Sequence, residues 1–206
     1  MRTLAQHIEE RLIINKNYND IYKYWPKDKQ DLERIIIEEH YNKGIYDLTD
    51  IDVSNITDFS YIFYEDKNTE NKDFNISSWD VSNGINFTSM FYGCIKFNCN
   101  LSNWNVSNCK VFSWMFAYCR NFNLNLSNWK VNNGRYFDAM FYGCTKFNSN
   151  LSNWKVNSGK DFSGMFYECI NFNSDLSQWT IQNTANVSDM FYKCNIDDKN
   201  KPKGVR

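Results

Sequence analysis

Apolar residues return along most of this chain with a step of 25 residues. One full unit runs from Asn125 to Ser149 and reads NLSNWKVNNGRYFDAMFYGCTKFNS. A degenerate unit, IDVSNITDFSYIF at 51–63, precedes the regular ones. A fixed period of this length is typical of repeat proteins whose units stack on one another. The five regular units begin at Asn75, Asn100, Asn125, Asn150 and Asp175.

The second half of each unit has the apolar spacing of a short helix. In the third unit Phe137, Met140, Phe141 and Cys144 follow the pattern i, i+3, i+4, i+7, which places them on one helical face. A helix of about two turns is not stable alone, so it must pack against its neighbours. The residue after the first phenylalanine is of a type that caps helix N-termini. These predicted caps are Thr88, Ser113, Asp138, Ser163 and Ser188.

The first half of each unit alternates apolar and polar residues. Trp129 and Val131 flank a polar residue, which predicts a strand with one buried face, and Asn133-Gly134 predicts a turn after it. Since one unit cannot bury its own apolar face, the units are expected to stack. The predicted fold class is an α/β repeat solenoid of about six strand–turn–short-helix rungs. A mostly β coil with irregular turns in place of the helices is the alternative.

The two ends of the chain lack the repeat. Residues 1–47 are predicted to form an α-helical N-terminal cap, with one helix around Leu4, Ile8 and Leu12 and a second from Leu32 to near Gly44. Such a cap would cover the open end of a repeat stack. Residues 48–197 are assigned to the repeats, and the lysine-rich residues 198–206 are predicted to be a disordered tail.

The repeat unit resembles a known family. The pattern N-L-S-x-W-x-V-S-N…F-S-x-M-F-Y-x-C-x-x-F-N is similar to the 25-residue BspA-like repeat, which occurs in mycoplasma lipoproteins, other bacterial surface proteins and some giant DNA viruses. The resemblance covers about Ile51 to Cys194. It implies a leucine-rich-repeat-like stack and an interaction role, often at a surface. The chain departs from the surface-protein pattern because it shows neither a leader nor a lipobox cysteine.

Charge and hydropathy exclude several function classes. Apolar residues make up 42% of the chain and the formal net charge is −1, so no clustered basic surface for nucleic acid is expected. No stretch approaches 18 consecutive apolar residues, which argues against membrane insertion. Without a signal-peptide pattern, the predicted location is intracellular, in the cytoplasm of the producing or host cell. A surface or secreted location is the alternative if a leader has been removed.

No catalytic, metal or cofactor site is predicted. The two histidines, His7 and His40, lie outside the repeats and are interpreted as surface residues. Five of the seven cysteines occupy one repeat position, where buried structural thiols are expected. The other two, Cys99 and Cys109, fall at variable positions and are predicted to be the more exposed thiols. The protein is therefore not expected to be an enzyme, and no cofactor is expected.

The asparagines that follow a repeated phenylalanine form a further ladder. Their side-chain amides are expected to bond from unit to unit and to the turn backbone, which is a structural role. They are Asn98, Asn123, Asn148 and Asn173.

The candidate partner-binding residues lie where the alternation points outward from the first halves of the units. Lys130 and Lys155 are expected to be adjacent on this face. Trp114 is added because it stands at a helix position held elsewhere by small or polar residues, and tryptophan is favoured at interface hot spots. The full candidate set is Asp80, Asn105, Lys130, Asn132, Lys155, Asn157, Thr180 and Trp114.

The sequence thus favours a non-enzymatic protein-interaction module with an unidentified protein partner. A structural or self-assembling protein that associates through its ends or its N-terminal helices is the alternative. A solubilising role for the outward residues is the plainer interpretation of the same pattern. The expected state in solution is a monomer or a weak homo-oligomer.

Overall fold

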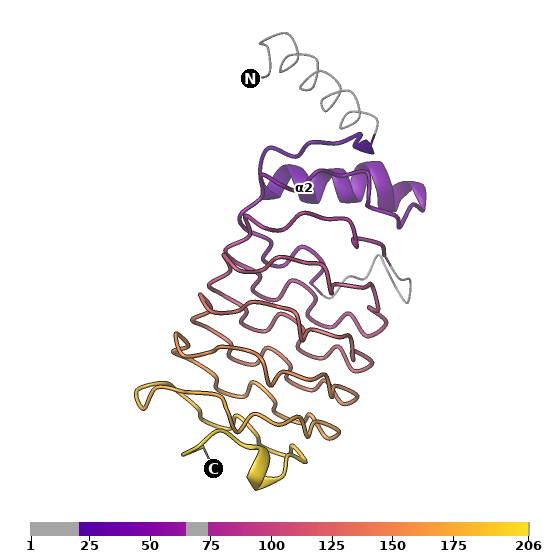
Figure 1. Cartoon of the computed structure of the whole chain (residues 1–206). Coiled ribbons are helices and arrows are strands. Elements are labelled where there is room, and N and C mark those ends of the chain that lie inside the picture. Colours follow the sequence, from indigo (N-terminus) through magenta and orange to yellow (C-terminus); the bar gives the residue numbers. More distant parts are fainter. Residues whose placement is uncertain (1–20, 65–73, 206) are drawn as a thin grey trace, which may run out of the picture.

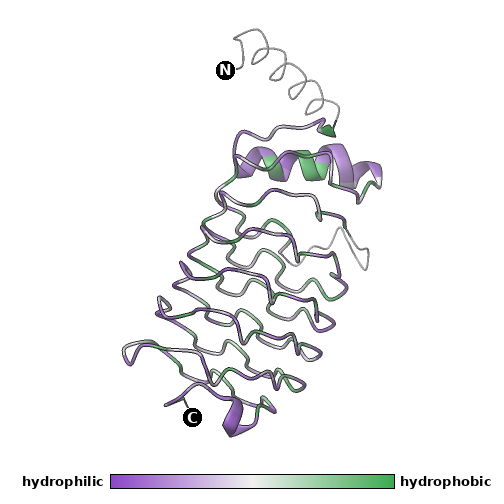
Figure 2. Ribbon diagram, in the orientation of Figure 1, coloured by the Kyte–Doolittle hydropathy of each residue, from purple (hydrophilic) through white to green (hydrophobic). Residues whose placement is uncertain are grey.

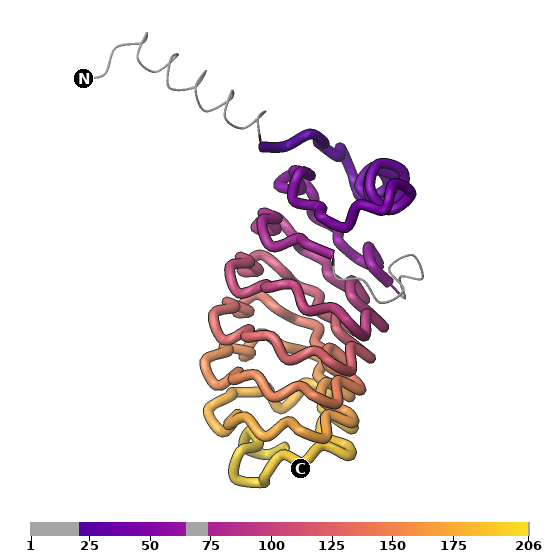
Figure 3. The backbone as a smooth tube through the Cα atoms, turned by 90° about the vertical axis from the view of Figure 1, so that its right-hand side faces the viewer, coloured from indigo at the N-terminus to yellow at the C-terminus, as the bar shows by residue number. Residues whose placement is uncertain are grey.

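The computed structural model describes residues 21–64 and 74–205. The repeats form a stack of irregular coils with helix α2 at one end and the C-terminal residues at the other (Figure 1). The α-helix α2 spans Lys29–Ile35, and it continues into the π-helix η1, Ile36–His40, and the 3-10 helix η2, Tyr41–Lys43. A further 3-10 helix, η4, spans Asp198–Asn200. The coils lie one upon another along the chain (Figure 3).

The predicted α/β solenoid of strand–turn–helix rungs is wrong, and with it the leucine-rich-repeat-like architecture. Within residues 21–64 and 74–205 there is no strand and no sheet, and the repeats contain no α-helix. Successive repeats are instead joined by isolated parallel bridges, one per repeat. The bridges between repeats link Asp58 to Asn86, Asn86 to Val111, Val111 to Tyr136, Tyr136 to Asp161, and Asp161 to Asn186.

The backbone of the second half explains why it is not helical. Two positions in each regular repeat have positive φ, a left-handed conformation that a right-handed helix cannot contain. Only some of these positions hold glycine, so sequence alone gives no consistent marker of the break. The first position is Ser89, Trp114, Ala139, Gly164 and Asp189; the second is Gly93, Tyr118, Gly143, Glu168 and Lys193.

Alternate amides of this half donate to the next repeat, and the amides between them donate three residues back, as Met90 N–H does to Phe87 O at 3.2 Å. Phe87 N–H donates to the Val111 carbonyl at 2.9 Å, and Phe91 N–H donates to Met115 at 2.9 Å. The expected caps do not start helices either. Thr88, for example, donates both its N–H and its hydroxyl to the Asn86 carboxamide oxygen, at 3.0 and 2.6 Å, and closes a local turn.

The first half is not a strand because its backbone turns at the tryptophan. Trp104 N–H donates to the Leu101 carbonyl at 3.0 Å, three residues back. The contact between repeats is made there by the indole: Trp129 Nε1 donates to Leu101 O at 3.0 Å. The predicted alternation of burial is nevertheless confirmed, because Trp129 and Val131 are buried while Lys130 is exposed.

Ladders of identical side chains fill the space between the two halves. The ring centroids of Phe116 and Phe141 are 5.8 Å apart, and those of Trp129 and Trp154 are 6.4 Å apart. Phe116 also packs on Trp129 across the core at 6.2 Å. Offset and edge contacts of this kind stabilise aromatic cores beyond the burial of area. Hydrophobic residues recur at matching points of successive coils (Figure 2).

Asparagine side chains join the turns of neighbouring repeats, as predicted. Asn148 N–H donates to Asn123 Oδ1 at 2.8 Å, and Asn173 N–H donates to Asn148 Oδ1 at 2.9 Å. The ladder continues to the end of the stack, where Asp197 N–H donates to Asn173 Oδ1 at 2.9 Å. These amides satisfy backbone groups at the ends of the coils, so they are structural.

The second predicted N-terminal helix is confirmed. Asp28 accepts from Asp31 N–H at its start, Leu32, Ile35 and Ile36 are buried, and Gly44 ends it with a φ of 70°. The first predicted helix, around Leu4, lies outside the described residues. The division of the chain at 47 and 197 stays a prediction.

Residues 198–205 differ from the expected disordered tail. The structure holds this segment against the last repeat: Leu176 N–H donates to the Asn200 carbonyl at 2.8 Å, and Pro202 is buried.

Candidate functional site

The seven candidates from the first halves of the repeats lie on one exposed polar face. Stacked tryptophans hold the repeats in register beneath it, with Trp129 and Trp154 only 2° from parallel. Equivalent positions of successive repeats therefore form rows on the surface. We call these residues the lysine face. Its members are Asp80, Asn105, Lys130, Asn132, Lys155, Asn157 and Thr180, all of them exposed.

Lys130 and Lys155 are the cationic centre of the lysine face. They occupy the same position in neighbouring repeats, and neither forms an ion pair with a described residue. Each of them follows a buried tryptophan that is fixed by a hydrogen bond, such as Trp154 Nε1 to Leu126 O at 3.0 Å. Two unpaired ammonium groups on a rigid base can meet an acidic or polar partner surface without rearrangement of the backbone.

Trp114 does not belong to the lysine face. It comes from the second half of its repeat, on the other side of the core, and is half-buried. Its ring lies 6.2 Å from Tyr92 and 5.7 Å from Tyr142. Its repeat has the buried Ala117 where its neighbours have these tyrosines, so Trp114 takes the place of the missing ring.

Trp114 is one member of an aromatic row that the sequence analysis missed. The ring centroids of Tyr142 and Tyr167 are 4.3 Å apart, and those of Tyr167 and Tyr192 are 4.7 Å apart. We call this row the tyrosine stripe. The signal was present in the sequence, because a tyrosine follows the repeated phenylalanine in most units. The members are Tyr61, Tyr64, Tyr92, Trp114, Tyr118, Tyr142, Tyr167 and Tyr192, all of them exposed or half-buried.

Charged groups border both ends of the tyrosine stripe. Lys29 Nζ lies 5.5 Å from the Tyr61 ring centroid, and Lys193 pairs with Glu168 at 3.0 Å beside Tyr192. In the middle, burial and the neighbouring Tyr167 hydroxyl raise the pKa of Tyr142 above its ordinary value. The Tyr142 hydroxyl therefore stays protonated at neutral pH.

Four of the five repeated cysteines are buried as predicted, whereas Cys194 is half-buried. The Cys144 thiol donates to the Phe116 carbonyl at 2.9 Å, and burial raises the pKa values of Cys119, Cys144 and Cys169 well above the usual thiol value. A raised pKa removes the thiolate that nucleophilic chemistry requires.

The two variable cysteines behave differently from each other. Cys99 is half-exposed. The prediction of an exposed Cys109 is wrong, because this side chain is buried and its thiol donates to Val111 O at 3.3 Å.

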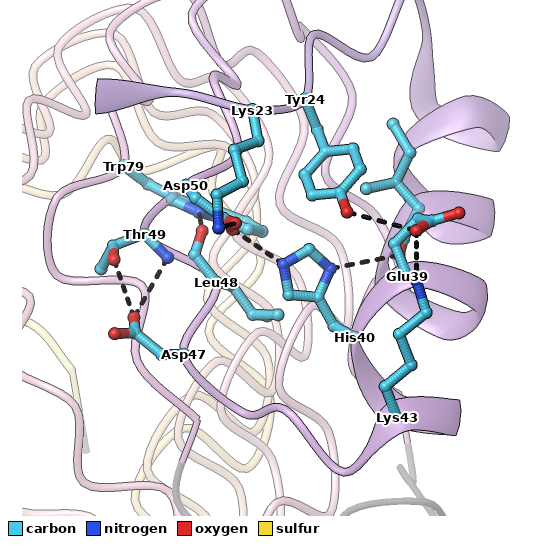
Figure 4. Close-up of polar contacts among 11 residues, drawn as sticks. Lys23, Tyr24, Glu39, His40, Lys43, Asp47, Leu48, Thr49, Asp50 and Trp79 are labelled. Atoms are coloured by element: carbon cyan, nitrogen blue, oxygen red, sulfur yellow. Dashed lines mark hydrogen bonds and ion pairs between the residues drawn. The ribbon is translucent and has the colours of Figure 1, made fainter. Parts of the chain in front are cut away.

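His40 was expected at the surface, and this is also wrong. The structure buries it between η1 and the first coil, where its Nε2 lies 2.8 Å from Asp50 Oδ1 and its Nδ1 lies 3.3 Å from Ile35 O. Tyr24 packs on the ring edge-on at 5.2 Å, and Lys23 lies 3.5 Å from the same aspartate (Figure 4). The cluster joins the N-terminal helices to the repeats. His7 lies outside the described residues.

Among residues 21–64 and 74–205, no group of three or more His, Cys, Asp or Glu side chains could hold a metal ion. In the same part of the chain, no helix has both the length and the apolar composition needed to span a membrane.

The chain matches one family model in two overlapping segments, residues 30–137 and 113–202. The overlap of the two matches agrees with an internally repeated sequence. No curated protein and no solved structure matches the chain. Because the first match alone covers more than half of the sequence, the chain belongs to the family described as Mycoplasma protein of unknown function, DUF285.

Proposed function

We propose that this protein is a non-enzymatic interaction module that binds a protein partner through the lysine face. The observation that carries the proposal is the exposure of all seven lysine-face residues on a backbone held in register by stacked tryptophans. A backbone that is already held in register loses little conformational freedom on binding, which favours the use of this polar surface for docking.

The finer resemblance to BspA-like repeats supports the same role. That family is associated with interaction at surfaces, and the repeat pattern from Ile51 to Cys194 carries the resemblance. The location we propose is intracellular, with a surface or secreted location as the alternative. The partner we propose is a protein and not a nucleic acid, since the formal net charge is −1.

The test is charge reversal on the lysine face. Affinity capture from lysate of the natural cellular setting, read by mass spectrometry, compares the intact protein with the Lys130→Glu, Lys155→Glu double variant. A matched control carries Lys146→Glu and Lys160→Glu, two exposed lysines outside the lysine face with the same total change of charge. A partner retained by the intact protein and by the control, but lost by the lysine-face variant, is the expected result.

Equal capture by all three proteins would contradict the assignment of this face. Thermal unfolding of each variant separates loss of binding from loss of fold, because exposed substitutions away from buried contacts change stability by only about 0.5 kcal/mol.

The alternative function is self-assembly through the ends of the stack or the N-terminal helices. It predicts oligomers of the full chain that disappear when residues 1–25 are removed. Sedimentation velocity at high protein concentration measures this directly. A strictly monomeric full-length protein would contradict it.

A further inference from the structure

The last repeat ends in a row of backbone groups without partners. In the repeat before it, the amides of Phe162 and Gly164 donate to the carbonyls of Asn186 and Ser188 at 2.8 and 2.9 Å. Two further amides of that repeat, those of Phe166 and Glu168, donate at 2.9 Å to Met190 O and Tyr192 O. The equivalent donors one repeat later are the amides of Val187, Asp189, Phe191 and Lys193.

These four amides donate to no described residue. The Ala185 carbonyl is likewise without a donor, whereas its equivalent, Lys160 O, accepts from Asn186 N–H at 2.9 Å. We call this row, from 185 to 193, the open edge. Unpaired backbone groups on an extended edge are a template for another segment of chain.

The described C-terminal residues form no backbone hydrogen bond with the open edge. They pack on the other half of the last repeat, where Asn200 O accepts from Leu176 N–H at 2.8 Å and Asn200 Nδ2 donates to Asn173 O at 3.1 Å. Met190 and Phe191 of the open edge are buried, but its outer side chains are more exposed than their counterparts. Tyr192 is 48% exposed, whereas the equivalent Tyr167 is half-buried.

The preceding repeats show which backbone groups pair with donors of this kind. At the preceding repeats the same donors are met by a segment of tight turns whose alternate carbonyls point back at them, with Met165 N–H bonded to Phe162 O at 3.1 Å inside the segment. Residues 160–168 are one such segment: Asp161 O and Ser163 O accept from the repeat before at 2.8 Å, and Met165 O does so at 3.0 Å. The segment also places Phe166 and Tyr167 on the aromatic ladders.

The side chains of the open edge also indicate which residues an added segment would place beside them. Phe191 and Tyr192 end two aromatic ladders, at 5.5 and 4.7 Å from the rings before them. Phe191 is only 8% exposed, whereas Tyr192 is 48% exposed and has Lys193 Nζ at 5.4 Å from its ring centroid. Lys193, which pairs with Glu168 of the preceding repeat at 3.0 Å, would lie beside a glutamate at the same position of an added segment.

From this geometry we propose that the open edge binds a peptide segment of a partner protein, added parallel to the last repeat as a further coil with the same turns, with a tyrosine at the position that meets Tyr192. Backbone hydrogen bonds supply the affinity and the aromatic positions supply the selectivity, as in strand addition to sheet edges. The open edge is separate from the lysine face, so this proposal does not depend on the proposed function.

The experiment uses the full chain and a labelled synthetic peptide, GKDFSGMFYE, which has the sequence of residues 159–168. Fluorescence anisotropy measures its binding beside a scrambled peptide of the same composition. Hydrogen exchange followed by NMR measures the amides of Val187, Asp189, Phe191 and Lys193. Their exchange is expected to slow by on the order of tenfold or more when the peptide saturates the protein. The already bonded amide of Phe162 serves as an internal reference.

Two variants test the side-chain part of the site. Tyr192→Ala is expected to weaken peptide binding roughly tenfold, since one aromatic contact of about 1.4 kcal/mol corresponds to that factor. Tyr136→Ala removes an exposed tyrosine away from the open edge and is expected to leave binding unchanged. The Lys130→Glu, Lys155→Glu variant is also expected to bind the peptide normally, so the two proposals can fail separately.

Three outcomes would overturn the proposal. The first is a peptide that binds no better than its scrambled form. The second is peptide binding that leaves the four amides exchanging freely. The third is slow exchange of these amides in the protein alone, with dimers in sedimentation, because the open edge would then be occupied by a second copy of the chain.

Discussion

The indole N–H groups of the tryptophan ladder offer a direct measurement of one hydrogen bond between repeats. Trp179 Nε1 donates to Leu151 O at 2.9 Å, whereas Trp104 Nε1 is buried and has no partner among the described residues. The two indoles are otherwise matched. Each is nearly fully buried, packs on two equivalent phenylalanines of the preceding repeat, and has one neighbouring indole at 6.2 or 6.5 Å.

Replacement by phenylalanine should therefore affect the two sites unequally. Both Trp179→Phe and Trp104→Phe lose a similar part of the buried ring. Trp179→Phe also loses a net hydrogen bond, about 1 kcal/mol, while the Leu151 carbonyl keeps the Trp154 amide at 3.0 Å. Trp104→Phe removes a buried donor that has no partner, so this variant avoids a desolvation cost of about 1 kcal/mol and is stabilised by that amount.

The expected difference in the free energy of unfolding is thus about 2 kcal/mol, with Trp179→Phe the less stable variant. For a chain of this size that corresponds to roughly 4–8 °C in Tm. Urea denaturation followed by far-UV circular dichroism measures the difference without relying on tryptophan fluorescence. Equal losses within about 0.5 kcal/mol would refute the assigned role of the indole hydrogen bond.

Two further predictions concern the packing of the turn and the cysteines. A Cβ at Gly134 would lie 3.0 Å from Val131 O and overlap the Phe137 ring, so Gly134→Ala should lower the free energy of unfolding by about 1–3 kcal/mol. The equivalent Cys109 already has a Cβ, and there the Phe87 and Phe112 ring centroids are 6.4 Å apart, compared with 5.3 Å between Phe112 and Phe137. Cys109→Ala should therefore lower the free energy of unfolding less than Gly134→Ala does. The reverse order of the two urea midpoints would contradict this. Cys99 should react with a disulfide reagent in the native protein while Cys119, Cys144 and Cys169 react only on unfolding, as counted by mass spectrometry over time. Fast native labelling of these three ladder thiols would contradict their burial.

The predicted burial of side chains agrees with the structure better than the predicted backbone does. The repeated Phe, Met and Trp residues are buried, and the lysine-face residues between them are exposed. The spacing of Phe137, Met140, Phe141 and Cys144 fits a helical face, but it fits equally well a coil in which tight turns bring the same four side chains inward. Periodicity therefore identified the core and misassigned the backbone that carries it.

The candidate site was predicted only in part. Trp114 was chosen as an isolated exposed ring, yet it fills a gap in the tyrosine stripe above Ala117. Cys109 was predicted to be exposed because it falls at a variable repeat position, and His40 because it lies outside the repeats. The Ile35 carbonyl is five residues back in the same helical segment, but Asp50 becomes a neighbour of His40 only when the N-terminal helices pack on the first coil.

The sequence by itself determined the repeat, its 25-residue step, and which positions lie in the core, because burial follows from hydrophobicity repeated in register. Only the tertiary structure decided the backbone. An amide such as Phe91 N–H can donate four residues back in a helix or to Met115 O in the next repeat, and the local sequence does not distinguish these partners. In the stack the amide donates to the next repeat, because left-handed residues such as Ser89 and Ala139 interrupt any helix. The local conformational cost of these residues is offset by the hydrogen bonds and ring contacts that the neighbouring repeats supply.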